Sequence, residues 1–340
     1  MVSDKKDSII LGIETSCDET SAAVLAGGNR LLSHVVASQI PTHQKYGGVV
    51  PEIASREHSL HFLPVIEAAL NGAGLDFFDL QAIAVTNGPG LVGSLLVGVS
   101  GAKAMAFAAW VPLIGVNHLE GHIYANFLEH PDIRFPLLAL LVSGGHTHLI
   151  LLREHGCYVV LGRTRDDAAG EALDKVARSL GLGYPGGPQI EKIAQDGNPG
   201  EFDFPRALLE PESLDFSFSG MKSAVLNTLN SAKMKGETLS IPDLAASFQM
   251  AVIDVLVQKT LHALQRNKVK TVALAGGVAA NRLLRERLHQ VLKPQGISLI
   301  YPSPGLCTDN GAMIAAAGYY RYLAGDFAAW TLNAVPGLDL

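Results

Sequence analysis

Two histidines four residues apart, His118 and His122, are the clearest candidates for metal chemistry in this chain of 340 residues. On a helix, side chains four positions apart lie one above the other, so two imidazoles at this spacing can hold one cation. The alternative is that both are ordinary polar residues on an exposed helix. An isolated pair favours that alternative, because a metal site needs at least one further ligand.

A third ligand is available in Asp309, within the segment Cys307-Thr-Asp-Asn-Gly-Ala-Met. This aspartate lies in a predicted turn just before an apolar helix that starts at Ala312. Its alternative role is to cap that helix, which aspartate often does at such a junction. Two imidazoles and one carboxylate leave coordination positions open for a substrate, as in iron(II) sites and catalytic zinc sites.

A metalloprotease is an alternative for such a ligand set, but the sequence lacks its general base. Zinc proteases of the H-E-x-x-H type carry glutamate directly after the first histidine. Here Leu119 occupies that position. Glu120 is two positions from each histidine, and residues two apart do not face each other on a helix.

Two glycine turns indicate a nucleotide site. The apolar run 137–142 ends in Ser143-Gly144-Gly145, and the run 272–275 ends in Gly276-Gly277. Glycines directly after a strand let backbone N–H groups approach a phosphate. Each turn alone has an ordinary explanation, a tight hairpin or close packing of strand on helix. Together they suggest a nucleotide held in a cleft between two lobes. Further polar or close-approach groups for it are Asp174, Gly187 and Asn281.

The order of predicted elements occurs twice along the chain. A strand–turn–strand pattern over 9–25 precedes a strand–glycine–helix pattern over 83–109, and the same two patterns recur over 137–152 and 272–292. This repetition predicts a duplicated α/β fold of two related lobes. Chance is the alternative, because strand–glycine–helix units recur in many α/β proteins.

The repeat also sets the expected domain limits. We expect lobe I over 8–117, with 310–326 packing back on it. Lobe II is expected over 118–309, with an insertion at about 163–240. Residues 327–340 are expected to form a loose C-terminal tail.

Composition limits the class of protein. Hydrophobic residues make up 48% of the chain and charged residues only 17%, so much of it must be buried. The formal net charge of −6 does not suggest a nucleic-acid binder, so contact with RNA would need a local basic surface or a helper protein. The apolar stretch 91–116 contains Lys103 and Pro112, and we interpret it as a buried helix followed by a strand, not a membrane span.

The cysteines and the N-terminus point to the cytoplasm. The three cysteines are Cys17, Cys157 and Cys307. No CxxC pair is present, which fits a reducing compartment and excludes a cysteine zinc knuckle. The only apolar run near the N-terminus, 9–13, is too short for a signal peptide.

Seven segments, in this order, resemble the motifs of one family. They are Ile13-Glu-Thr-Ser-Cys-Asp-Glu-Thr20, Gly47-Gly-Val-Val-Pro-Glu-Ile-Ala-Ser-Arg56, His118-x-x-x-His122, Leu141-Val-Ser-Gly-Gly-His146, Asp215-Phe-Ser-Phe-Ser-Gly220, Ala275-Gly-Gly-Val-x-x-Asn281 and Cys307-Thr-Asp-Asn-Gly-Ala312. Over roughly residues 8 to 325 the chain resembles the tRNA threonylcarbamoyladenosine transferases, the TsaD proteins. The serine at position 143, in place of tyrosine, makes the chain resemble the bacterial branch of that family.

The resemblance implies a two-lobed fold related to actin, hexokinase and the chaperone ATPases (the ASKHA fold). It implies a threonylcarbamoyl-AMP donor made by a separate synthase. The acceptor is then the exocyclic amine of adenosine 37 in tRNAs that read codons beginning with A. The implied partners are a TsaB-like inactive paralogue and a TsaE-like ATPase, in the cytoplasm and away from membranes.

The resemblance also implies roles for individual residues. One iron(II) per subunit, with zinc as the alternative, is expected on His118, His122 and Asp309. The expected donor-site residues are Leu141, Val142, Ser143, Gly144, Gly145, Asp174, Gly187, Asn281 and Glu191. We expect direct attack by the adenine amine, with no covalent enzyme intermediate and no nucleophilic side chain.

Two further alternatives compete with the transferase. A small-molecule kinase on the same fold would use ATP, magnesium and a carboxylate near the first hairpin, where Glu14, Asp18 and Glu19 are candidates. The second alternative is a non-catalytic scaffold protein of a tRNA-modifying assembly. The His/His/Asp set argues against both, because neither needs it.

Overall fold

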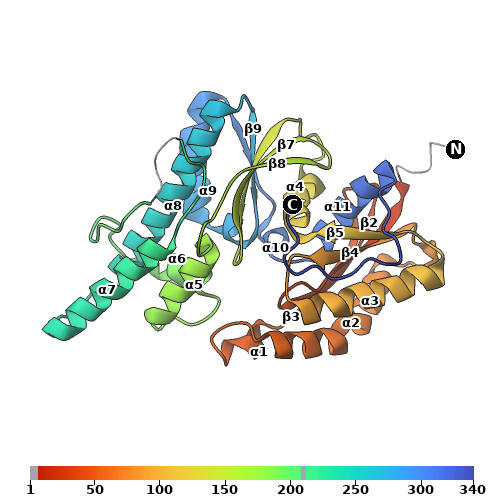
Figure 1. Cartoon of the computed structure of the whole chain (residues 1–340), viewed down its shortest axis with the longest axis horizontal. Coiled ribbons are helices and arrows are strands. Elements are labelled where there is room, and N and C mark those ends of the chain that lie inside the picture. Colours follow the sequence, from red (N-terminus) through yellow and green to blue (C-terminus); the bar gives the residue numbers. More distant parts are fainter. Residues whose placement is uncertain (1–6, 208–211) are drawn as a thin grey trace. The chain divides into compact units, whose positions relative to one another are not determined.

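The computed structural model describes residues 7–207 and 212–340 (Figure 1). The chain forms two compact units, each containing one five-stranded mixed sheet. Unit 1 runs up to Ile133 and resumes at Pro302, and unit 2 runs from Arg134 to Tyr301.

The sheet of unit 1 has the strand order β3-β2-β1-β4-β5. Its strands are β1 (Ile9–Glu14), β2 (Glu19–Ala26), β3 (Arg30–Ser38), β4 (Ala82–Gly88) and β5 (Leu113–Asn117). The helices of this unit are α1 (Ile40–Gln44), α2 (Pro51–Ala73), α3 (Val92–Ala109), α4 (His118–Glu129), α10 (Pro304–Cys307) and α11 (Gly311–Ala324), and the 3-10 turn is η2 (Phe77–Asp79). β1 pairs antiparallel with β2 and parallel with β4.

The sheet of unit 2 has the order β10-β9-β6-β7-β8. Its strands are β6 (Leu137–Val142), β7 (Thr147–Glu154), β8 (Cys157–Arg163), β9 (Thr271–Ala275) and β10 (Ser298–Ile300). The helices are α5 (Ala169–Ser179), α6 (Gly186–Ala194), α7 (Ser219–Lys235), α8 (Ile241–Arg266) and α9 (Arg282–Leu292), with 3-10 turns η3 (Gly277–Ala280) and η4 (Lys293–Gln295).

The two sheets have the same topology. Read from the β8 edge, the second sheet runs β8-β7-β6-β9-β10, which matches β3-β2-β1-β4-β5 strand for strand. In both, the first strand pairs antiparallel with the second and parallel with the fourth. This shared order confirms the predicted duplication of an α/β unit.

The two faces of the first sheet bury alternate residues of each strand. Leu11 and Ile13 of β1 point into a core shared with α2 and α3, where they meet Phe62 and Val99. The intervening Gly12 faces α11, and a Cβ there would overlap the backbone of that helix. The period of two therefore lets α2 and α3 cover one face while α11 covers the other (Figure 1).

The domain limits differ from those expected. The sequence placed 118–309 in the second lobe, but helix α4 and the segment from Pro302 belong to unit 1. The reason is packing, since α4 lies against α11, which itself lies on β1 and β2. The expected insertion at 163–240 contains α5, α6 and α7.

The sequence predicted a loose C-terminal tail over 327–340, but the structure shows an ordered one. Its backbone is hydrogen-bonded to unit 1: Ala328 N–H donates to Leu113 O, and Val335 N–H donates to Asn87 O. Gly90 N–H in turn donates to Pro336 O. These bonds fix the tail along the ends of β4 and β5.

Two helices in the described part of the chain, α3 and α8, are long and apolar enough to cross a membrane. For α8, 67% of the apolar window is buried inside its unit, as in the core helix of a globular protein. α3 packs on β4 and α2 and is followed by strand β5, as predicted, but only 33% of its apolar window is buried, so the prediction of a buried helix is only partly confirmed.

Candidate functional site

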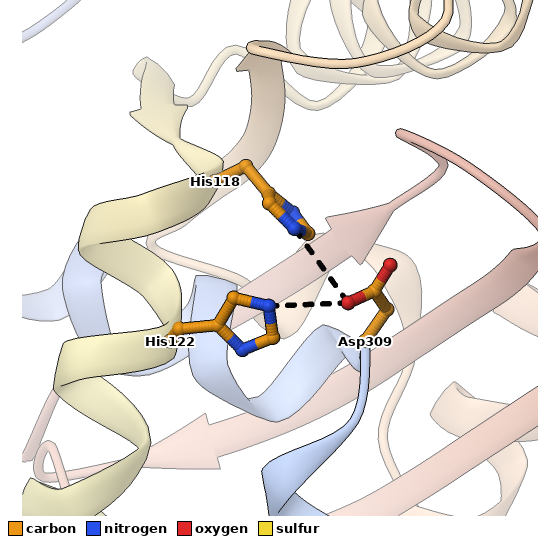
Figure 2. Close-up of side chains that lie close together, drawn as sticks. All are labelled: His118, His122 and Asp309. Atoms are coloured by element: carbon orange, nitrogen blue, oxygen red, sulfur yellow. Dashed lines mark ion pairs between the residues drawn. The ribbon is translucent and has the colours of Figure 1, made fainter. Parts of the chain in front are cut away.

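The two histidines and the aspartate lie together in unit 1. His118 and His122 project from the first turns of α4 toward Asp309 (Figure 2). The Nε2 atom of His122 lies 3.2 Å from Asp309 Oδ1, and that of His118 lies 3.6 Å from the same oxygen. One ligand atom from each residue falls within 4.8 Å of the others, close enough to share a cation.

The start of α4 is fixed so that both imidazoles face the aspartate. Asn117 caps the helix, and its Oδ1 accepts a hydrogen bond of 2.8 Å from Leu119 N–H. Glu120 is buried and bonds the Arg321 guanidinium of α11 at 2.6 and 2.9 Å. This side chain points away from the histidines, as the spacing predicted, and ties α4 to α11.

Asp309 does not cap α11. That role belongs to Asn310, whose Oδ1 accepts from Met313 N–H at 2.9 Å. The capping alternative for Asp309 is therefore wrong. Its carboxylate extends toward α4 instead.

The burial of His122 supports a cation at this cluster. The residue is only 1% exposed, and no described group forms a hydrogen bond to either ring nitrogen, although Nε2 faces the Asp309 carboxylate at 3.2 Å. Buried polar atoms in native proteins are nearly always satisfied. A metal ion on Nε2 would satisfy one of the two, so the described residues fit a cation held by His118, His122 and Asp309.

The electrostatic environment favours positive charge. Burial lowers the pKa of His118, but the Asp309 and Glu14 carboxylates outweigh burial and raise that pKa to about 9. Burial raises the pKa of Glu14, yet the neighbouring His118 holds it below its ordinary value. Two carboxylates around a buried imidazole make a site that attracts a cation.

Residues predicted for the donor site gather in unit 2 at the carboxyl ends of β6 and β9, which pair in parallel up to Leu141 and Ala275. The side chains of Leu141 and Val142 are fully buried in the sheet, so only the turn that follows is accessible. Gly144 and Gly145 are exposed with open space around their Cα atoms. The turn therefore presents backbone to its surroundings, as the glycine pattern predicted.

Close backbone approach surrounds this turn. A Cβ on Gly276 would overlap the carbonyl of Val142, and one on Gly170 would lie 2.5 Å from the carbonyl of Ser143. Glycine at Gly276, where φ is +86°, is thus required by space and by conformation.

The remaining predicted donor-site residues meet around helix α6. Asp174 Oδ1 accepts hydrogen bonds from the N–H groups of Gly186 and Gly187, at 2.7 and 3.3 Å. Glu191 Oε1 accepts from Arg282 N–H at 2.8 Å, next to Asn281. Asn281 itself caps α9 through Leu284 N–H. These carboxylates and this amide join α5, α6 and α9, so they position the loops.

Sequence reasoning missed that Glu14 contacts the cluster of His118, His122 and Asp309. Sequence reasoning named it only as a catalytic carboxylate for a kinase. The side chain is 0% exposed and accepts hydrogen bonds from Ser16 and Thr86, beside His118. A buried carboxylate engaged in this way is not available to magnesium or ATP, which weakens the kinase alternative. The signal in the sequence that could have found this contact is a charged residue, Glu14, at the end of an apolar strand.

Comparison with known proteins places the chain in one family. Residues 30–316 match the TsaD family, described as tRNA N6-adenosine threonylcarbamoyltransferase. A protein of that name from Desulfitobacterium hafniense (strain Y51) is 71% identical over 335 residues, which is 98% of both chains. Its counterpart in Bacillus cereus (strain ATCC 14579) is 57% identical over 337 residues, or 99% of this chain and 98% of the relative.

The fold is shared more widely. A crystal structure of full-length HypF in a phosphate- and nucleotide-bound form superposes with a TM-score of 0.64 at 13% identity. The match covers 94% of this chain and 56% of HypF. At that identity the likeness establishes the ASKHA-type fold alone. On its sequence matches along almost the whole length, the chain belongs to the tRNA N6-adenosine threonylcarbamoyltransferase family.

Proposed function

We propose that this chain transfers the threonylcarbamoyl group from threonylcarbamoyl-AMP to the exocyclic amine of adenosine 37 in tRNAs that read codons beginning with A. The observation that carries this proposal is 71% identity, over 98% of the chain, to a transferase of that name. In the reaction, the adenine amine forms a bond to the carbamoyl carbon. The bond from that carbon to the phosphate oxygen breaks, AMP leaves and the amine loses a proton.

We further propose that His118, His122 and Asp309 hold one iron(II), with zinc as the alternative. When bound, the ion would act as a Lewis acid toward the oxygens of the threonylcarbamoyl group. The unsatisfied ring of His122 and the two carboxylates around His118 support this assignment. The chain's own contribution is to hold the ligands in place through the Asn117 cap.

The glycine turn of unit 2 is proposed to receive the adenylate. Its members are Leu141, Val142, Ser143, Gly144 and Gly145. Exposed backbone N–H groups at a turn can stabilise the negative charge that develops on AMP as it leaves. Asp174, Gly187, Glu191 and Asn281 hold the adjoining helices. HypF, of the same fold, is described as binding phosphate and a nucleotide, which supports this placement. No side chain is assigned as a nucleophile.

Partner proteins are proposed to supply part of the tRNA-binding surface. A net charge of −6 does not favour tRNA, so a TsaB-like paralogue and a TsaE-like ATPase would complete its surface. Exposed apolar side chains on α2 and α3 support a protein partner there. They are Leu60, Leu63, Val92 and Leu96. The assembly is proposed to be cytoplasmic.

Reconstitution tests the function. Threonylcarbamoyl-AMP, an ANN-decoding tRNA and the candidate partners are combined with the wild type, His118→Ala or Asp309→Ala. Mass analysis of nucleosides should show threonylcarbamoyladenosine with the wild type and a large loss with both variants. His289→Ala, at an exposed position in the last turn of α9 and outside the proposed partner surface, is the matched control. Phosphate transfer from γ-labelled ATP to a small molecule, without the modified nucleoside, would support a kinase instead.

A further inference from the structure

The buried carboxylate Glu14 approaches the metal centre from the sheet side. It ends β1 and is 0% exposed. Its Oε1 accepts from Ser16 N–H, and its Oε2 accepts from the Thr86 hydroxyl at 2.7 Å. The same Oε2 lies 3.1 Å from Nδ1 of His118. The catalytic scheme above gives this group no role.

The contact decides which nitrogen of His118 is free for a cation. A carboxylate that already accepts from Ser16 and Thr86 can only accept from an imidazole nitrogen as well. Nδ1 must therefore carry a proton. The Ser16 hydroxyl oxygen also lies 3.1 Å from Nδ1, and it can accept from the same N–H group. The opposite nitrogen, Nε2, is the one that faces Asp309, at 3.6 Å. The ring is thus oriented with its ligating nitrogen toward the cluster.

The second histidine has no such support. Nδ1 of His122 is buried and has no hydrogen-bond partner among the residues that the structure describes. The two ligands are consequently unequal, since His118 is oriented by a hydrogen bond and His122 by packing and by whatever occupies Nε2.

We propose that Glu14 is a positioning residue, which holds His118 in the Nδ1–H form so that Nε2 ligates the metal and which ties the cluster of α4 and the segment before α11 to strand β1. This inference rests on the proposed metal site. Carboxylates that accept from the distal nitrogen of a ligating histidine typically change metal affinity by about 10- to 100-fold when they are replaced.

The nearly isosteric variant Glu14→Gln separates this role from simple burial. Ser16 N–H can donate only to the amide oxygen, so the amide NH₂ must take the place of Oε2. There it would donate to Nδ1 of His118 and move the ring proton to Nε2, the ligating atom. The fold can survive this change, but metal binding should not.

The control variant is Thr86→Val. It removes the other hydrogen bond to Oε2 and leaves the carboxylate charge and the His118 contact in place. We expect Glu14→Gln to bind zinc about 10- to 100-fold more weakly than the wild type. Thr86→Val should stay within about threefold, in competition titrations against a chelator and with circular dichroism as the check on folding.

Nitrogen NMR of the zinc-loaded wild type provides an independent readout if a variant does not fold. The spectrum should show His118 with a protonated Nδ1 and a zinc-bound Nε2, assigned by comparison with His118→Ala. A zinc-bound Nδ1, no zinc binding by the wild type, or zinc affinity of Glu14→Gln within threefold of wild type would each overturn the inference. If zinc binds as expected but no tRNA is modified, the proposed function fails while the role of Glu14 stands.

Discussion

At the scale of single residues, the proposed metal centre is a set of polar groups held in place by other polar groups. Glu14 contacts Nδ1 of His118. Asn310 caps α11, so the Asp309 carboxylate does not have that role. Such partners decide which atoms face the cation. The same setting perturbs nearby carboxylates that are not ligands.

Glu19, at the start of β2, gives a pH-dependent prediction. Burial is the main reason that its pKa rises from 4.5 to about 7, and within residues 7–207 and 212–340 its Oε2 has no hydrogen-bond partner. A folded-state pKa above the unfolded value means that the folded protein holds this proton more tightly. Stability should therefore fall as pH rises from about 4.5 to 7. Glu19→Gln should raise the melting temperature of the metal-free protein at pH 8 and leave it nearly unchanged at pH 4.

The control for this prediction is Glu67→Gln, because Glu67 is an exposed carboxylate of α2. Thermal melts of both variants in chelator would check the prediction. An equal gain for Glu19→Gln at pH 4 and pH 8 would show that ionisation of Glu19 is not what destabilises the protein.

Residue-level roles were only partly predictable from the sequence. The four-residue spacing of His118 and His122 indicated a shared face, and one missing ligand pointed to Asp309. The bond between Glu14 and His118 joins positions 104 residues apart, and no local pattern records it. The donor-site assignment stays a prediction, and no pattern in the sequence indicated the hydrogen bonds of Asp174 and Glu191, because these depend on how α5, α6 and α9 meet.

At the scale of elements, the hairpins and the glycine turns followed from local pattern. Apolar runs separated by turn residues predicted the ends of β1, β2, β6 and β7 to within two residues. The packing partner of α11 was harder to predict from the sequence. Its contact with β1 depends on glycines that are far apart along the chain.

Gly12 of β1 packs directly against the backbone of α11, so replacing Gly12 tests that packing. A Cβ at Gly12 would overlap the backbone nitrogen of Ala315 and the carbonyl of Gly311, neither of which can rotate away. Gly12→Ala should therefore destabilise unit 1 by about 1–3 kcal/mol through overpacking. Urea unfolding followed by tryptophan fluorescence would measure this, because Trp110 and Trp330 both belong to unit 1.

Gly72→Ala is the matched control within the same unit. Gly72 lies in α2, where a Cβ would come no closer than 3.4 Å to Ser33. Alanine is the better helix former, so this variant should gain about 0.5–1 kcal/mol. Equal effects of the two substitutions would contradict the close packing of α11 on β1.

At the scale of the whole molecule, the duplication was visible in the sequence but the domain limits were not. A chain that crosses to unit 2 after Ile133 and returns at Pro302 places the three proposed metal ligands in one unit, although Asp309 is far from α4 in sequence. The tail was misjudged for a similar reason. Its order comes from backbone bonds to distant strands and not from its own composition.

The tail should contribute to the metal centre through Asn117. The Nδ2 of this cap donates to the carbonyl of Asp339 at 3.0 Å, while its Oδ1 holds the first turn of α4. Deleting residues 334–340 also removes the bonds at Asn87 and Gly90. At about 1 kcal/mol for each hydrogen bond, unit 1 should lose about 1–3 kcal/mol of stability and bind zinc less tightly.

Asp339→Ala is the control for the deletion, because it keeps the backbone carbonyl that Asn117 uses. Melting curves and zinc titrations should place this variant with the wild type. A truncated chain with unchanged zinc affinity and melting temperature would mean that the tail does not support α4.

The central claim is that the cluster of His118, His122 and Asp309 is a metal centre required for transfer to tRNA. The most direct measurement strips the reconstituted protein of metal, restores iron(II) or zinc in steps, and quantifies threonylcarbamoyladenosine by nucleoside mass analysis. Wild-type product should rise with metal up to one ion per chain, whereas His122→Ala should stay near background at every step. Wild-type levels of modified nucleoside from the stripped protein, or from His122→Ala, would contradict the account.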